Sequence, residues 1–184
     1  MPQVYMVGTL IGASGFNNRP LFAKFRIDFG KEHWHVAEGS IQGQTFSSEP
    51  NPNQNIVVWN HAIDVSFSCS GVQGWPRILV EIYFHDSESR VDFAGYAFAY
   101  LPAAAGRHML ELPGFRPQGS IMDDIRARFV GGYPQYTEAN VVMSAQKRWR
   151  QKTVSTGTVH LEINTILKGF DDEGILANSR PPTN

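Results

Sequence analysis

The sequence predicts an all-β protein: an antiparallel β-sandwich of about eight strands with one short helix inserted in a connection. Apolar residues alternate with polar residues at a period of two over several segments, which is typical of half-buried strands. The 17 Gly and 11 Pro residues are scattered between these segments at turn positions. One stretch alone departs from the period of two and carries helix signals.

The strands follow one another along the chain with turn residues between them. In the segment from Leu21, apolar residues occupy every second position, and the same alternation recurs in the segments from Ile63 and from Val159. The segment from Ile78 is almost entirely apolar, as in a central strand that is buried on both faces. The expected strands are Val4 to Ile11, Leu21 to Phe29, Ile41 to Phe46, Ile63 to Cys69, Ile78 to Phe84, Tyr96 to Leu101, Met109 to Leu112 and Val159 to Ile163.

The helix is expected to begin after Ser120. Ser120 caps the helix and Asp123 stands three residues later, which is the spacing of a capping box. Gly131-Gly132 and then Pro134 end the helix. Its apolar residues share one face: Ile121, Ile125 and Phe129.

Chain length limits the number of domains, and net charge limits the class of partner. The 184 residues fit one domain, expected over residues 1–176, followed by a polar, disordered tail over residues 177–184 that contains Pro181-Pro182. The 16 Lys+Arg and 17 Asp+Glu residues give a net charge of -1, which argues against a nucleic-acid partner.

Cysteine content and hydropathy indicate a cytoplasmic protein. Cys69 is the single cysteine, so neither an intrachain disulfide nor a cysteine-based zinc site is expected. No positive charge precedes the first apolar stretch, and no apolar run approaches the ~18 residues that span a bilayer. We therefore expect neither a signal peptide nor a membrane anchor.

No residue pattern points to catalysis or to a metal. His33 and His35 lie two apart and would face the same side of a strand, but any third histidine ligand would come from a distant segment, so surface histidines are favoured. The segment Gly12 to Gly15 is not the serine elbow of hydrolases. We predict no catalytic residue, no metal site, no cofactor and no enzymatic activity.

Two segments are candidates for binding a partner. In the run from Lys147 to Lys152, four cations surround a tryptophan. Such a run would contact anionic lipid, nucleic acid or an acidic partner, although a solvated edge strand is the favoured interpretation. Trp75 and Arg77 open the most apolar strand near a loop, where a core or corner role for Trp75 is favoured over an exposed one. The candidate partner-binding residues are Trp75, Arg77, Lys147, Arg148, Trp149, Arg150 and Lys152.

The segment Ile82 to Gly95 resembles a calcium-binding loop of the C2 domain in its Asp86, Ser89, Asp92, Phe93 and Gly95. Phe84 stands where that loop carries another aspartate, so two carboxylates remain for a cation that needs six to eight oxygens. Asp86 and Asp92 are therefore interpreted as loop and turn formers. A calcium-independent binder of anionic phospholipids is the alternative function, with these candidate lipid-facing loop residues: Asn17, Asn18, Arg19, Asp86 and Arg90.

An ordered set of motifs resembles the B9-domain family over about Val4 to Gly174. The motifs are Gly74-Trp75-Pro76-Arg77, Gly95-Tyr96-Ala97-Phe98, Leu101-Pro102, Gly106, His108, Phe115-Arg116-Pro117-Gln118-Gly119-Ser120 and Phe129-Val130-Gly131-Gly132-Tyr133-Pro134. The resemblance implies a C2-like β-sandwich that acts as a non-enzymatic scaffold at the ciliary transition zone and basal body, part of the cytoskeleton. It also implies two sibling partners, the Meckel syndrome type 1 protein and B9 domain-containing protein 1. Tubulin and an anionic membrane surface are further candidate partners.

Overall fold

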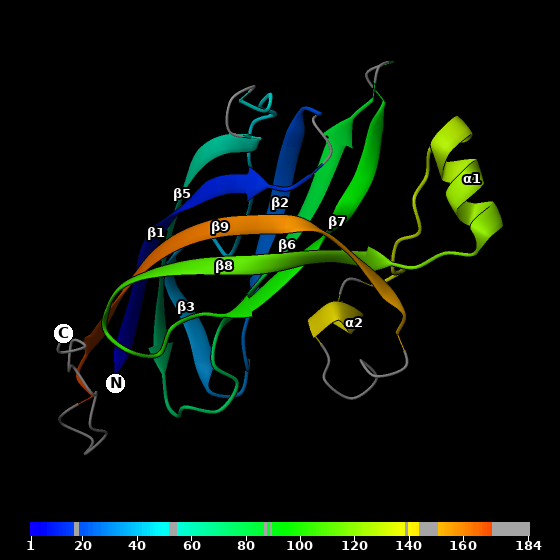
Figure 1. Cartoon of the computed structure of the whole chain (residues 1–184). Coiled ribbons are helices and arrows are strands. Elements are labelled where there is room, and N and C mark those ends of the chain that lie inside the picture. Colours follow the sequence, from blue (N-terminus) through cyan, green and yellow to red (C-terminus); the bar gives the residue numbers. More distant parts are fainter. Residues whose placement is uncertain are drawn as a thin grey trace, which may run out of the picture.

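Nine strands and two helices make up the described part of the chain in a computed structural model (Figure 1). The structure describes residues 1–16, 19–51, 55–86, 88, 90–138, 140–143 and 151–170. The elements are β1 (Gln3–Ser14), β2 (Leu21–Asp28), β3 (Trp34–Gly39), β4 (Gln42–Gln44), β5 (Ile56–Cys69), β6 (Arg77–His85), β7 (Val91–Tyr100), β8 (Gly106–Pro117), α1 (Ile121–Val130), α2 (Asn140–Met143) and β9 (Thr153–Lys168). The predicted tail and the run 147–150 lie outside the described residues, so both stay predictions.

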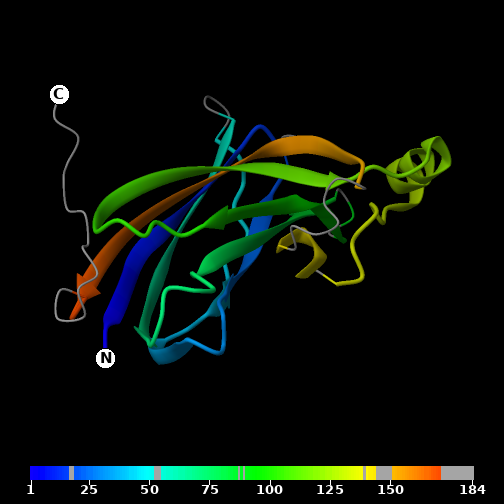
Figure 2. The same ribbon diagram turned by 90° about the horizontal axis from the view of Figure 1, so that it is seen from below.

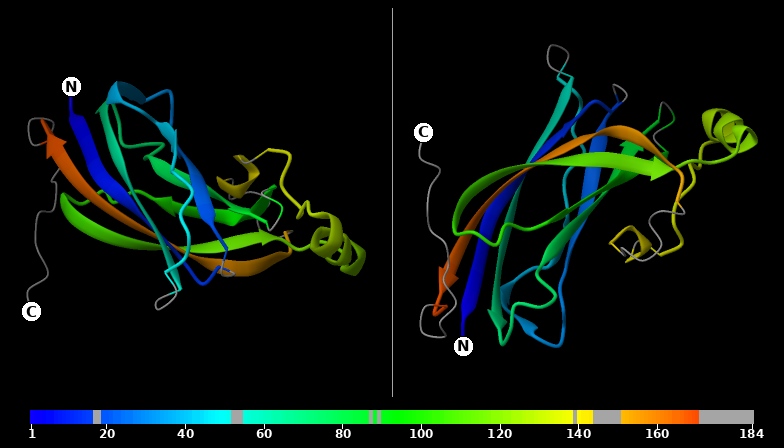
Figure 3. Two further views of the ribbon diagram at one scale, coloured as in Figure 1. Left: turned by 90° about the horizontal axis from the view of Figure 1, so that it is seen from above. Right: turned by 60° about the horizontal axis from the view of Figure 1, so that its bottom comes forward.

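All nine strands belong to one antiparallel sheet in the order β3-β5-β1-β9-β8-β7-β6-β2-β4. The pairing between neighbouring strands is shortest between β7 and β8, where only Tyr96 with Phe115 and Ala97 with Gly114 are paired. The sheet curls at this seam, so that the five strands from β3 to β8 lie over the four strands from β7 to β4 (Figures 1 and 3). The predicted all-β antiparallel sandwich is therefore confirmed.

The main core fills the space between the two layers. Inward-facing residues of β6 (Ile78, Val80, Ile82) and of β9 (Val159, Leu161, Ile163) are fully buried, as their patterns predicted. A second cluster lies on the outer face of the layer that contains β6 and β7. There Leu79, Phe93 and Tyr96 of β6 and β7 pack against Val142 and Met143 of α2.

β3 and the first part of β5 are missing from the prediction, each for a physical reason, and β7, β8 and β9 also extend beyond their expected bounds. β3 is an edge strand that buries only Trp34 and exposes the rest, so it shows no alternation. β5 begins seven residues before Ile63. This first part was not predicted, because Asn60 adopts a φ of 47° opposite a register shift in β1, and the irregularity breaks the period of two in the sequence. The four-residue α2 was also not predicted.

The predicted helix α1 is confirmed, including its ends. The Ser120 hydroxyl accepts a hydrogen bond from the Asp123 N–H, and the Asp123 carboxylate accepts one from the Ser120 N–H, which completes the capping box. Gly131 follows the helix with a φ of 83°. α1 extends away from the sandwich at the end where β8 stops (Figures 1 and 2).

Candidate functional site

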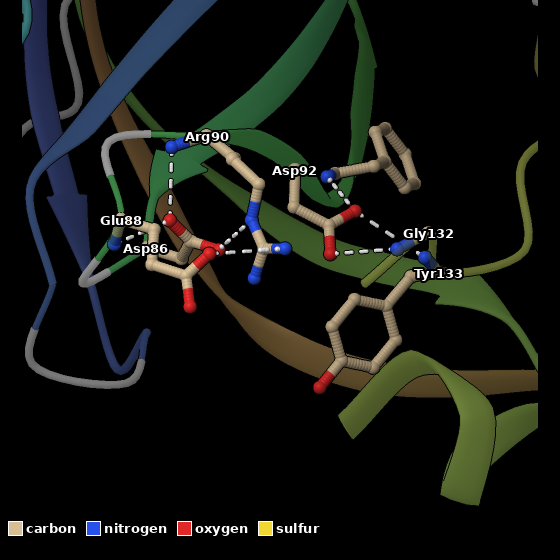
Figure 4. A network of polar contacts seen from close by, with 7 residues as sticks. Asp86, Glu88, Arg90, Asp92, Gly132 and Tyr133 are labelled. Carbon is tan, nitrogen blue, oxygen red and sulfur yellow. Dashed lines mark hydrogen bonds and ion pairs between the residues drawn. The ribbon is translucent and has the colours of Figure 1, made fainter. Parts of the chain in front are cut away.

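The loop between β6 and β7 is closed by bonds within itself (Figure 4). Asp86 Oδ1 accepts hydrogen bonds from the backbone N–H groups of Glu88 (2.8 Å) and Arg90 (2.9 Å). Asp86 Oδ2 accepts a third from Arg90 Nε at 2.7 Å. The Arg90 backbone N–H, and then its guanidinium, lower the pKa of Asp86 below its ordinary value, so this carboxylate is ionised at neutral pH.

Asp92 ties the segment after α1 to the start of β7 (Figure 4). Its Oδ1 accepts from the N–H groups of Phe93 (2.7 Å) and Tyr133 (3.3 Å), and its Oδ2 accepts from the Gly132 N–H (3.0 Å). The interpretation of Asp86 and Asp92 as loop and turn formers is confirmed by these bonds. Within the described ranges, no group of three or more His, Cys, Asp or Glu side chains is placed to hold a metal.

We expect Asp92→Ala to lower the free energy of unfolding by about 2 kcal/mol, because three backbone donors lose a charged acceptor. For a chain of this size the midpoint of thermal unfolding then falls by about 4–8 °C. Asp92→Asn is the matched control, since it retains one acceptor oxygen. Its midpoint of thermal unfolding should fall by less than half as much. Equal midpoints for wild type and Asp92→Ala would contradict an anchoring role.

A cavity of about 160 Å³ lies beside this loop, where the two layers open. Two arginines line it, each stacked on an aromatic ring: Arg19 Cζ lies 4.7 Å from the centre of the Phe84 ring, and Arg116 Cζ lies 4.3 Å from that of Tyr133. The described residues of its lining include no carboxylate. Sequence reasoning selected Arg19 and missed Arg116, whose motif was noted only as a family resemblance.

Trp75 and Arg77 lie at the other end of β6 and form internal contacts. The Trp75 indole N–H donates to the Leu101 carbonyl at 2.9 Å. Arg77 pairs with Asp28 at 2.7 Å and donates to the Met143 carbonyl of α2 at 2.9 Å. Both residues line an open cleft of about 290 Å³. These contacts favour the corner role for Trp75 and give Arg77 the role of holding α2.

The remaining predicted site residues are separated from Trp75 and Arg77. Arg19, Asp86 and Arg90 lie at the opposite end of β6, beside the cavity and its loop. Lys152 is exposed just before β9. Asn17, Asn18, Lys147, Arg148, Trp149 and Arg150 lie outside the described residues. The structure therefore does not bring the predicted residues together into one site.

The apolar face of α1 points into solvent. The side chains at positions 121, 122, 125 and 129 fall within about 100° around the helix axis. We call these residues the α1 stripe; their exposed fractions are Ile121 80%, Met122 72%, Ile125 48% and Phe129 80%. Helices of soluble proteins normally turn such a face toward the core, so its exposure marks a candidate interaction surface. The sequence predicted this shared face but not its exposure.

One serine and one histidine meet on the outer face of the sheet. Ser14 Oγ and His160 Nε2 are 2.8 Å apart, and Glu111 is the cross-strand neighbour of His160. Glu111 and His160 form none of the ion pairs seen among the described residues. A serine nucleophile needs a base that a third group orients, and this geometry does not provide it.

No helix in the part of the chain that the structure describes is long and apolar enough to cross a bilayer.

Comparison with known proteins gives a consistent result. Residues 4–166 match the family described as "Ciliary basal body-associated, B9 protein". The chain is 39% identical to human B9 domain-containing protein 2, over 95% of this chain and 99% of that protein. It is 30% identical to the Drosophila melanogaster protein of the same name (95% and 98%) and 28% identical to mouse B9 domain-containing protein 1 (89% and 86%). A C2 domain of plant extended synaptotagmin 1 aligns with a TM-score of 0.43 and 12% identity, over 88% of this chain and 92% of that domain.

Proposed function

Because this chain belongs to the family of ciliary basal body-associated B9 proteins, we propose that it is a non-enzymatic scaffold subunit of the ciliary transition-zone complex. Its partners would be the sibling B9 proteins, namely the Meckel syndrome type 1 protein and B9 domain-containing protein 1. In this role it would support ciliogenesis and the diffusion barrier for membrane proteins at the cilium base. The proposal is supported above all by the alignment with B9 domain-containing protein 2 over nearly the full length of both chains.

The surface for a sibling is the α1 stripe. Burying its four side chains would remove on the order of 600 Å² from water, close to the ~800 Å² that each partner contributes to a standard interface. An apolar helix face of this kind binds into a groove on the partner through residues spaced three, four and seven apart. Ile121, Ile125 and Phe129 have the required spacing of four, and Met122 and Phe129 the spacing of seven.

Asp92 also contributes to this role. Its bonds to Gly132 and Tyr133 fix the end of α1 relative to β7, so that the stripe is presented in one direction. A preorganised surface binds more tightly, because less conformational freedom is lost on association.

The test is light scattering after size exclusion, first with this chain alone and then with it co-expressed with the two siblings. We expect a defined complex that contains one copy of each protein. A chain that stays monomeric in the presence of both siblings would contradict the proposed assembly.

A second candidate is calcium-independent binding to anionic phospholipids, favoured by the exposed Arg19 beside a loop whose carboxylates are already bonded. Each basic residue near an anionic surface contributes about 1 kcal/mol. Sedimentation with phosphatidylserine vesicles should then show binding that salt weakens and calcium leaves unchanged. No sedimentation at low salt would eliminate this candidate.

A further inference from the structure

One side chain of the α1 stripe can be oxidised. Of the four residues in the stripe, Met122 alone has a side chain with an atom other than carbon and hydrogen. Its thioether sulfur reacts with peroxides, whereas the hydrocarbon side chains do not. Met122 is 72% exposed, and it lies on α1, which extends away from the sandwich (Figure 2). The stripe therefore carries one accessible group whose polarity a chemical reaction changes.

Met122 differs from the methionines of the strands and of α2. Met6 and Met143 are buried, so their sulfur atoms are shielded from a dissolved oxidant. Met109 is 61% exposed, but its cross-strand neighbour in β9 is the charged Glu162. A polar group at Met109 therefore lies in a polar part of the surface, whereas a polar group at Met122 interrupts an apolar one.

Oxidation changes the part of the stripe that a partner has to cover. Hydrogen peroxide transfers one oxygen atom to Sδ of methionine, which is oxidised to the sulfoxide, and the peroxide is reduced to water. The sulfoxide oxygen accepts hydrogen bonds from water, and these bonds are lost when it is buried in an apolar groove. In the free chain the oxygen stays in water. Oxidation of Met122 is therefore expected to weaken binding and to leave the fold intact.

We propose that Met122 is a reversible oxidation site that regulates the α1 stripe. The thioether form binds into the apolar groove of a sibling B9 protein, and the sulfoxide form does not. The inference rests on the proposed function, because it needs the stripe to be the surface that a sibling covers. Reductases that use thiols reverse the reaction: the sulfur returns to the thioether, the oxygen leaves as water, and two thiols are oxidised to a disulfide.

The experiment measures binding to the purified siblings before and after this chain alone is treated with hydrogen peroxide. Catalase removes the peroxide before the siblings are added. We expect the treated chain to bind roughly tenfold more weakly or worse, because an acceptor is buried without a donor, while its midpoint of thermal unfolding is unchanged. Methionine sulfoxide reductases A and B together with dithiothreitol should restore binding, since the two enzymes act on the two epimers of the sulfoxide.

Met122→Leu is the variant that assigns the effect to one sulfur atom, because leucine has a similar volume and helix propensity but is not oxidised. Each variant is compared with its own untreated form, so that an effect of the substitution itself cancels. Treated Met122→Leu should bind within about twofold of its untreated form, although the exposed Met1 and Met109 are still oxidised. Met109→Leu is the matched control, and it should lose binding on treatment as the wild-type chain does.

Peptide mass spectrometry adds a second readout, the rate at which each sulfoxide forms. An excess of the siblings should slow oxidation of Met122 by roughly fivefold or more, because an interface excludes solvent, and should leave Met109 unchanged. The inference is overturned if the siblings bind the treated and untreated wild-type chains equally, or if Met122→Leu loses as much binding on treatment as the wild-type chain. Failure of the untreated chain to bind the siblings is a separate outcome, which overturns the proposed function and the inference with it.

Discussion

Replacing Met122 by Glu and Phe129 by Lys is expected to abolish the complex with the sibling B9 proteins while the chain remains folded. Both side chains are exposed, by 72% and 80%, so their removal from the free chain loses little packing. The new charges agree with the helix dipole, since Glu enters the first turn and Lys the last turn of α1, and they leave the net charge unchanged. In the complex, two apolar anchors are lost and two charges are buried, which weakens binding by roughly a hundredfold or more.

The measurement is co-purification with the siblings, together with thermal unfolding of the chain alone. Phe46→Lys combined with Val72→Glu is the matched control, because these side chains are also exposed (88% and 53%) and the charges introduced are the same. The control should form the complex normally. A stripe variant that co-purifies like wild type would show that the siblings bind elsewhere, even if the scaffold role itself holds.

Trp34→Ala is expected to have the largest effect on stability. Trp34 is only 1% exposed, and its ring meets the edges of Phe67 and Trp75 with centroid distances of 6.0 Å and 4.9 Å. Its indole N–H donates to the Gln73 carbonyl at 2.9 Å, so the side chain fixes edge strand β3 to the loop before β6. Truncating a buried tryptophan costs about 3–5 kcal/mol, because a large cavity remains.

Thermal unfolding followed by circular dichroism measures this effect. For a chain of this length we expect the midpoint to fall by about 10 °C. Val36→Ala, in the same strand but facing solvent, should change the free energy of unfolding by less than about 0.5 kcal/mol. Equal small shifts for the two variants would contradict the role of Trp34 in fixing β3 to the loop before β6.

Where one face of a strand is buried, the fold could be predicted from the sequence. β2, β6 and β9 alternate or are continuously apolar because each is paired on both sides and turns one face toward the main core. β3 could not be predicted, since an edge strand with a single buried residue has no period. The early part of β5 was missed because a bulge shifts the phase of its apolar residues.

The candidate surfaces could be predicted only in part. The spacing in the sequence shows that α1 has an apolar face, but whether the sandwich covers that face depends on the direction in which Asp92 and Gly132 hold the helix. Arg116 gives no local signal, because its neighbour Arg19 in the cavity comes from the other end of the chain. The hydrogen bond from Trp75 to the Leu101 carbonyl agrees with the corner role that its place at the start of a strand favoured.

Amide hydrogen exchange across α1 tests the assembly most directly. The helix extends from the sandwich and buries only Ala127 among its described side chains, so its amides should exchange quickly in the isolated chain. In a mixture with the two sibling B9 proteins we expect exchange over residues 121–130 to slow by roughly tenfold or more, while the free edge of β3 is unchanged. Exchange that is identical over the whole chain with and without the siblings would contradict the proposed assembly.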